Sequence, residues 1–139
     1  MDTEIDGDEA QGYLDAMVAR RGYVLDYHKV MAAHDFPVLQ AADGLVSAAY
    51  LSQRHLSRET KELLFILSLT VLRAGPAHIA SHIRVALGLG VTPAEILEAL
   101  EIALPEAGVV AFQHGFDVWR EVVGAEGLEP SPALDAPGS

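Results

Sequence analysis

Signals that start and stop α-helices recur along the chain, and they constrain its fold more than any other feature of the sequence. The clearest is Thr92-Pro93-Ala94-Glu95, in which threonine suits the N-cap, proline the first helical position and glutamate the third. Ser57 marks a second N-cap, followed by Glu59 and Glu62 in the early turns, where the helix dipole favours negative charge. No stretch of useful length shows the alternation of a strand. The sequence therefore predicts an all-α domain.

Six helices with short connections account for the spacing of the apolar residues. They are expected at residues 9–33, with a break near Gly22, and at 36–53, 58–73, 76–87, 93–104 and 109–123. Asp35 is expected to cap the second helix, with Pro37 in its first turn, and Gly88-Leu89-Gly90 to end the fourth as a glycine C-cap. The third helix is apolar nearly all round and is expected to be central.

One domain is expected for a chain of 139 residues. We assign residues 9–124 to this helical domain. Residues 1–8 are acidic and poor in apolar side chains, which indicates an N-terminal tail. Residues 125–139 are rich in proline and glycine without periodicity, which indicates a flexible C-terminal tail.

The composition of the chain indicates where the protein is located and which classes of partner it is expected to have. Apolar residues make up 50% of the chain, more than one small core is expected to hide, which favours subunit contacts in a homo-oligomer. No apolar run approaches the ~20 residues of a membrane span, and the N-terminus is acidic where a secretory signal would be basic. We therefore expect a cytoplasmic protein without a membrane partner. A net charge of -11, with nine scattered lysines and arginines, argues against a nucleic-acid partner.

The chain contains no cysteine. Disulfides, thiolate metal ligands, iron–sulfur clusters and cysteine nucleophiles are therefore excluded. Any chemistry must come from other side chains.

Three proton-active residues stand on two successive, otherwise apolar helices. Glu62 lies early in the third expected helix, while His78 and His82 lie four residues apart, hence on one face, in the fourth. One interpretation is a solvated acid and two half-exposed imidazoles. A second is a three-ligand metal site for a divalent ion such as zinc or iron. A third is metal-free acid–base chemistry, in which Glu62 orients one imidazole and the other moves a proton.

The other histidines have simpler interpretations. His34 beside Asp35 is expected at a helix end, and His55 in a loop. His28 and His114 stand on apolar helices and are expected at the edge of the core, although either is able to join a pocket.

Two segments resemble the carboxymuconolactone decarboxylase and alkyl hydroperoxidase D superfamily. The first is Leu56-Ser57-Arg58-Glu59-Thr60-Lys61-Glu62-Leu63-Leu64. The second runs from His82 to Leu100 and contains Gly90-Val91-Thr92-Pro93-Ala94-Glu95-Ile96. The resemblance covers about residues 56–123. It implies a helical bundle like that of alkyl hydroperoxidase D, assembled into a homo-oligomer, a trimer or a hexamer.

The resemblance also bears on activity. The thiol branch of the superfamily carries Cys-x-x-Cys-x-x-x-His, with a glutamate on the preceding helix in a proton relay. Aligned on this chain, His82 takes the place of the family histidine, Glu62 that of the glutamate, and the cysteine positions fall on Gly75 and His78. Thiol peroxidase activity is thereby ruled out. In the decarboxylase branch, the corresponding segment is similar to Glu-Trp-x-x-His, with a carboxylate four residues before the histidine. His78 stands at that carboxylate position in this chain.

We therefore expect an atypical enzyme of this superfamily, decarboxylase-like or lyase-like, that acts on a small organic acid or lactone. Glu62, His78 and His82 are its expected catalytic residues, and they are also the candidate ligands of a divalent metal ion. Two alternatives stay open: a metal-binding protein with a Glu-His-His site, and a noncatalytic oligomeric protein with a binding or regulatory role.

Overall fold

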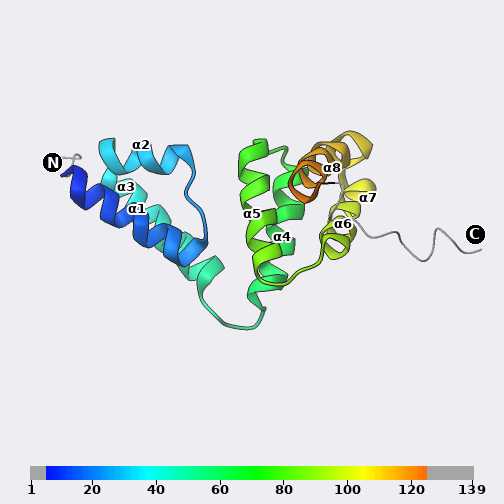
Figure 1. The fold of residues 1–139 in the computed structure, drawn as a ribbon, viewed down its shortest axis with the longest axis horizontal. Helices are drawn as coiled ribbons and strands as arrows, with labels where there is room; N and C mark the ends of the chain where they lie inside the picture. Colours follow the sequence, from blue (N-terminus) through cyan, green and yellow to red (C-terminus); the bar gives the residue numbers. More distant parts are fainter. Residues whose placement is uncertain (1–5, 125–139) are drawn as a thin grey trace, which may run out of the picture. The chain divides into compact units, whose positions relative to one another are not determined.

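The computed structural model describes residues 6–124, and its elements are helical (Figure 1). The elements are α1 (Gly7–Arg21), α2 (Asp26–His34), α3 (Phe36–Val46), the π-helix η1 (Ser47–Leu51), α4 (Arg58–Val71), α5 (Pro76–Gly88), α6 (Pro93–Glu101), α7 (Ala103–Ala107) and α8 (Val109–Val123). Over these described residues there is no strand, which confirms the all-α prediction. None of the described helices combines the length and the apolar character needed to cross a membrane.

Residue contacts divide the chain into two compact units, residues 1–65 and 66–139, with the division inside α4. A single domain over residues 9–124 stays a prediction. The expected C-terminal tail, 125–139, lies outside the described residues, as do residues 1–5 of the expected N-terminal tail. Helix α1 begins at Gly7 rather than at Glu9, because the Asp6 side chain accepts a hydrogen bond from the Asp8 amide at 3.4 Å.

Three of the six expected helices are each divided over the described residues, one of them, expected at 36–53, into α3 and η1. The break expected near Gly22 separates α1 from α2. Gly22 ends α1 in the left-handed region at φ 89°, which glycine adopts without steric cost. The segment expected as one helix to Leu104 forms α6 and α7. Pro105 stands in the first turn of α7, where its missing N–H removes no intrahelical hydrogen bond.

The predicted caps are mostly confirmed. Thr92 accepts from the Glu95 amide at 3.1 Å, and Glu95 accepts from the Thr92 amide at 3.0 Å, which completes the capping box of α6. The Ser57 hydroxyl accepts from the Thr60 amide at 3.1 Å before α4. Asp35 occupies the N-cap position of α3, but its side chain makes no capping hydrogen bond.

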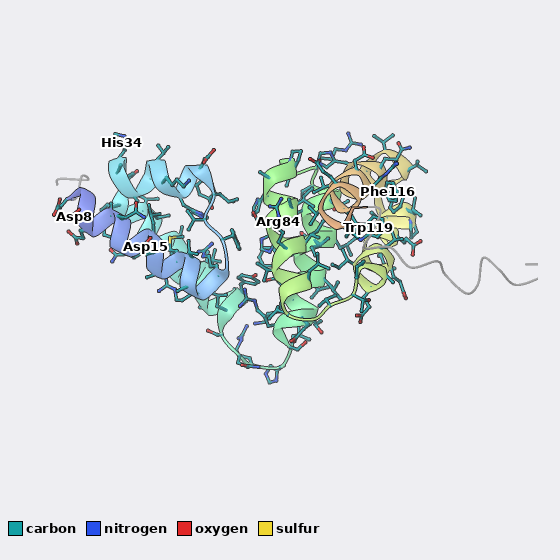
Figure 2. The ribbon with its side chains drawn as sticks, in the orientation of Figure 1. Asp8, Asp15, His34, Arg84, Phe116 and Trp119 are labelled. Atoms are coloured by element: carbon teal, nitrogen blue, oxygen red, sulfur yellow. The ribbon has the colours of Figure 1, made fainter. Side chains whose placement is uncertain are left out.

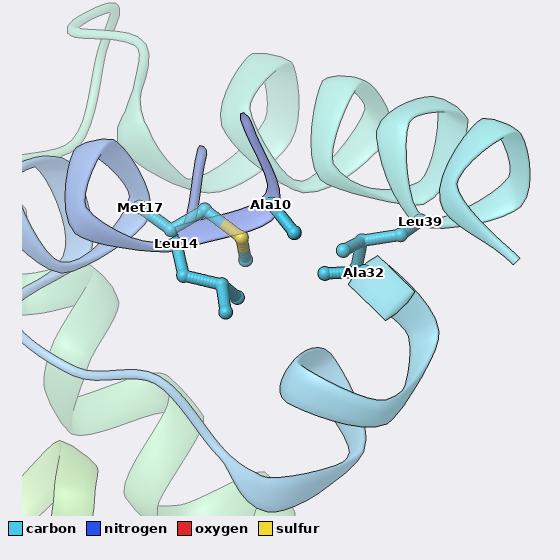
Figure 3. Packing of buried hydrophobic residues seen from close by; sticks show 5 residues of the cluster. All are labelled: Ala10, Leu14, Met17, Ala32 and Leu39. Atoms are coloured by element: carbon cyan, nitrogen blue, oxygen red, sulfur yellow. The ribbon is translucent and has the colours of Figure 1, made fainter. Parts of the chain in front are cut away.

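The first unit has its core where α1, α2 and α3 meet (Figure 3). The buried cluster consists of Ala10, Leu14, Met17, Ala32 and Leu39. Three of these residues, at positions 10, 14 and 17, recur at helical spacing on one face of α1. The cluster is therefore small, with three residues from α1 and one each from α2 and α3.

In the second unit, α8 packs against α5, α6 and α7. The buried apolar residues of this unit include Ile79, Ile83, Ile96, Leu100 and Trp119. The Trp119 indole N–H donates to the Pro93 carbonyl at 3.0 Å, and its ring lies 5.6 Å from that of Phe116 between centroids (Figure 2). The aromatic residues of α8 thereby tie it to the start of α6.

The third expected helix, 58–73, which is apolar nearly all round and was expected to be central, is buried on only part of its surface. Ile66 and Leu69 are buried, whereas Leu64 and Leu72 are 51% and 74% exposed. Apolar composition alone does not identify which faces of a helix are covered within one chain.

Candidate functional site

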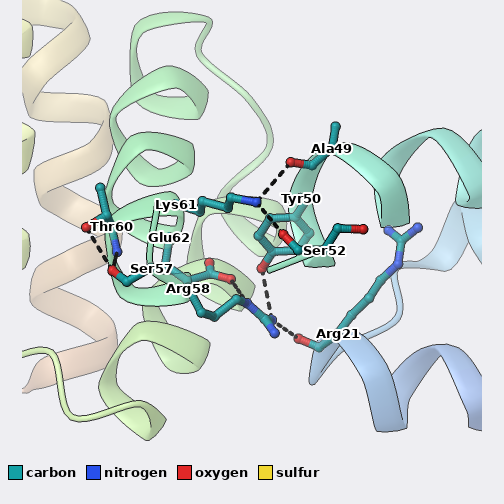
Figure 4. A network of polar contacts seen from close by, with 9 residues as sticks. All are labelled: Arg21, Ala49, Tyr50, Ser52, Ser57, Arg58, Thr60, Lys61 and Glu62. Atoms are coloured by element: carbon teal, nitrogen blue, oxygen red, sulfur yellow. Dashed lines mark hydrogen bonds and ion pairs between the residues drawn. The ribbon is translucent and has the colours of Figure 1, made fainter. Parts of the chain in front are cut away.

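Glu62 is a fully buried carboxylate in the second turn of α4 (Figure 4). Arg58 precedes it by four residues and therefore lies on the same helix face. The Arg58 Nε donates to Glu62 Oε1 at 3.1 Å, and the Arg58 side chain keeps 25% exposure. A buried charge costs free energy unless it is paired, and this ion pair places an opposite charge beside the Glu62 carboxylate.

Arg58 links Glu62 to the rest of the first unit. Its Nη2 donates to the Arg21 carbonyl at 3.0 Å and to the Tyr50 hydroxyl at 3.1 Å, and its guanidinium lies 4.8 Å from the Tyr50 ring centroid. Burial lowers the pKa of Arg58, but an arginine stays charged at any physiological pH. Glu62 is thus held by a cation that is itself fixed by α1 and η1.

His78 and His82 lie on one face of α5, as their spacing predicted, with ring centroids 5.4 Å apart. His82 is fully buried and His78 is half-buried. Burial, together with the charge of His82, lowers the pKa of His78 below its usual value of 6.5. His78 is therefore a neutral imidazole near pH 7, in the form that accepts a proton.

A metal site at Glu62, His78 and His82 stays a prediction. Within residues 6–124, no group of three or more His, Asp or Glu side chains is placed to hold a metal ion. The structure pairs Glu62 with Arg58 and places His78 beside His82.

The remaining histidines have the structural surroundings that we expected. His28 is buried, and its Nδ1 accepts from the Leu25 amide at 3.0 Å. The His114 Nε2 lies 2.7 Å from the Ala74 carbonyl, to which it donates. His34 is exposed at the end of α2 (Figure 2). His55 is exposed between η1 and α4.

A second buried carboxylate, Asp43 on α3, was not identified from the sequence. It accepts from Tyr13 Oη and Arg20 Nη2, both at 2.7 Å, and from Arg21 Nη2 at 2.5 Å. Burial alone would raise the Asp43 pKa, but the hydrogen bonds from Tyr13 and Arg21, with the charges of Arg21 and Arg20, hold that pKa below its usual value. This cluster joins α1 to α3 and is a structural feature of the first unit.

These observations define a class: an all-α, cysteine-free protein with ionisable side chains buried on successive helices. A sequence model of the carboxymuconolactone decarboxylase family matches residues 37–121, and the chain belongs to that family. The match begins in α3, well before residue 56, where we expected the resemblance to begin. Searches of curated proteins and of solved structures gave no match.

The positions that align with the thiol-branch cysteines lie at the start of α5. Gly75 is the N-cap of this helix, and His78 is in its first turn. By the resemblance, the place where the thiol branch would carry its second cysteine is held in this chain by an imidazole whose pKa burial lowers.

Proposed function

We propose that the chain is a lyase-like enzyme that acts on a small organic acid or lactone by proton transfer, with Glu62, His78 and His82 as catalytic residues. The observation that carries this proposal is the complete burial of Glu62 and His82, on successive helices of the stretch that matches the family. Removing ionisable groups from water costs several kcal/mol, and buried ionisable groups gather at functional sites.

Each residue has a distinct role in this proposal. His82 delivers a proton to the substrate, and His78, neutral near pH 7, accepts or relays one. Glu62 orients an imidazole and stabilises its protonated form, while Arg58 is a positioning residue that holds Glu62 through their ion pair.

For a decarboxylation, the proton and electron balance is simple. The bond between a substrate carbon and its carboxylate breaks, carbon dioxide leaves, and the electron pair stays on that carbon. A proton from the imidazolium then forms the new C–H bond, and the imidazole recovers a proton from water. No oxidant or thiol is needed, which agrees with a chain that has no cysteine.

The test is an activity screen of the full chain on carboxymuconolactone, other lactones and small carboxylic acids, with carbon dioxide release as the readout. His78→Ala, His82→Ala and Glu62→Gln should each lower kcat by about 10²–10⁴-fold, while His34→Ala, which removes an exposed histidine, should not. An unchanged rate in His82→Ala would remove the proposal. Absence of turnover on the whole panel would favour the noncatalytic alternative.

Elemental analysis tests the metal-assisted version. The protein should be purified untagged and without chelator, in parallel with His78→Ala and His82→Ala. One zinc or iron ion per chain, lost in both variants, would place these histidines in a metal site. Absence of a stoichiometric ion would leave metal-free acid–base chemistry.

We further propose that the protein is cytoplasmic and that it forms a homo-oligomer, a trimer or a hexamer. Sedimentation velocity would test the oligomeric state.

A further inference from the structure

The first unit contains an apolar pocket that the proposed chemistry does not use. Its volume is about 520 Å³, within the range of about 300–1,000 Å³ typical of small-molecule sites. Its apolar lining consists of Leu45, Val46, Ala49, Leu56, Leu64 and Phe65. None of the three proposed catalytic residues lines this pocket.

Several of these apolar side chains are exposed to a degree that is unusual for leucine. Leu45 is 72% exposed, Leu64 51% and Leu56 47%. Scattered exposed leucines need no explanation, but a contiguous group around a hollow is typical of a binding surface. The pocket therefore presents apolar area that a ligand would remove from water.

The charged groups that line the pocket share one sign. They are Arg54 and Lys61, and none of the lining residues is acidic; Tyr50 and His55 are its other polar residues. The whole chain has 20 acidic and only nine basic residues, so a lining with two strong cations and no carboxylate is opposite in sign to the chain average. Such a pocket attracts an anion and disfavours a cation.

The wall of the pocket is fixed by a hydrogen-bonded turn. Lys61 donates to the Ala49 carbonyl at 3.2 Å and to the Ser52 carbonyl at 2.8 Å (Figure 4). These bonds join the end of η1 to α4, and the Tyr50 and Phe65 rings pack edge to face, 4.5 Å apart. An ammonium has three N–H donors, so Lys61 retains one for a ligand. The π-helical form of η1 is uncommon and occurs often at functional sites.

We propose that this pocket binds a monocarboxylate with an apolar body, such as a medium-chain fatty acid. The apolar body lies against Leu45, Leu64 and Phe65, and the carboxylate faces Arg54 and Lys61. The apolar area supplies the affinity, and the basic side chains select the anion.

Isothermal titration calorimetry on the full chain tests this proposal, with decanoate as the probe and decyltrimethylammonium as its charge-reversed counterpart. Decanoate should bind with a stoichiometry of one, and the ammonium compound at least about tenfold more weakly. Arg54→Glu should weaken decanoate by about fivefold or more and should not weaken the cation.

The matched pair Leu45→Asp and Leu72→Asp separates the pocket from general surface effects. Leu72 is 74% exposed, like Leu45, but it lies in the second unit and does not line the pocket. Leu45→Asp should weaken decanoate at least tenfold, while Leu72→Asp should leave it unchanged. Equal effects of the two variants, equal affinity for both probes, or no binding of decanoate would overturn the proposal.

Two further readouts keep this inference independent of the proposed catalysis. His82→Ala should bind decanoate as the parent does, because His82 does not line the pocket. Sedimentation velocity of Leu45→Asp tests the competing occupant. If the parent is an oligomer that this substitution dissociates, and decanoate binds to neither form, a second copy of the chain covers the pocket and the ligand proposal is wrong.

Discussion

Gly115 on α8 lies so close to its neighbours that one added methyl group has no room there. A Cβ built there would overlap Thr70 Oγ1 and would lie 2.5 Å from Thr70 Cγ2 and 2.9 Å from Leu100 Cδ2. Ordinary carbon–carbon contacts are about 3.5–4.0 Å. Thr70 is fully buried on α4 and β-branched, so it has little freedom to turn away. Gly115→Ala therefore forces α8 away from α4 within the second unit.

The expected magnitude combines two opposing effects. Overpacking of a well-packed core costs about 1–3 kcal/mol, and three close contacts place this site at the upper end. Alanine offsets about 1 kcal/mol of that cost, because it has a higher helix propensity than glycine. We expect the free energy of unfolding of Gly115→Ala to fall by about 2 kcal/mol, and its Tm by about 6–10 °C.

Thermal and urea unfolding followed by circular dichroism would measure the difference. Gly12→Ala is the matched control, because Gly12 is exposed inside α1 with nothing within 4 Å of the added Cβ. This control should gain about 0.5–1 kcal/mol. Thr70→Ala removes both Thr70 atoms in the clash, so it should restore part of the loss when combined with Gly115→Ala. A Gly115→Ala protein as stable as the parent, or one that Thr70→Ala does not rescue, would refute the reasoning.

Three further outcomes are expected. Asp43→Asn should lower the free energy of unfolding by about 3–5 kcal/mol at pH 7, because it leaves Arg21 buried without its anion. Since the folded pKa of Asp43 lies below 3.8, its stabilisation is complete above that pH and is lost as pH falls through the folded pKa; urea titrations of both proteins at several pH values would check this. Thr92→Ala should cost about 1 kcal/mol through the cap of α6, as measured by thermal unfolding, and an unchanged Tm would contradict it. For any demonstrated activity, kcat/KM should rise with pH through a pKa below 6.5, because His78 must be neutral to accept a proton; a His78→Gln profile that keeps this limb would count against the assignment.

Most of the features that could be predicted from the sequence depend on residues three or four positions apart in one helix. The capping box at Thr92 and the cap at Ser57 involve residues three positions apart, so their hydrogen bonds are set by the helix itself. The facing of His78 and His82 follows from the same periodicity. The Arg58–Glu62 ion pair has this spacing too, and could have been assigned from it.

Contacts between distant segments were beyond sequence reasoning. Asp43 meets Tyr13 and two arginines from another helix, and no local pattern distinguishes it from a solvated acid. The close approach of Gly115 to Thr70 likewise depends on how α4 and α8 cross. A π-helical turn differs from an α-helical one by a single hydrogen-bond register, so the change at Ser47 left no signal in the apolar spacing.

The π-helical turn η1 sets the direction in which its own side chains point. A π-helix bonds each amide to the carbonyl five residues earlier rather than four, as the Ser52 amide does with the Ser47 carbonyl at 2.9 Å. Each hydrogen-bonded ring of η1 therefore encloses one more residue than a ring of the α3 helix that it continues. One residue corresponds to a rotation of about 100° in an α-helix. Deleting a single residue within Ser47–Leu51 would therefore turn Tyr50 away from both Arg58 and Phe65. A one-residue change in chain length at this point would act as a rotation of side chains, whereas the same deletion in a loop would only shorten it.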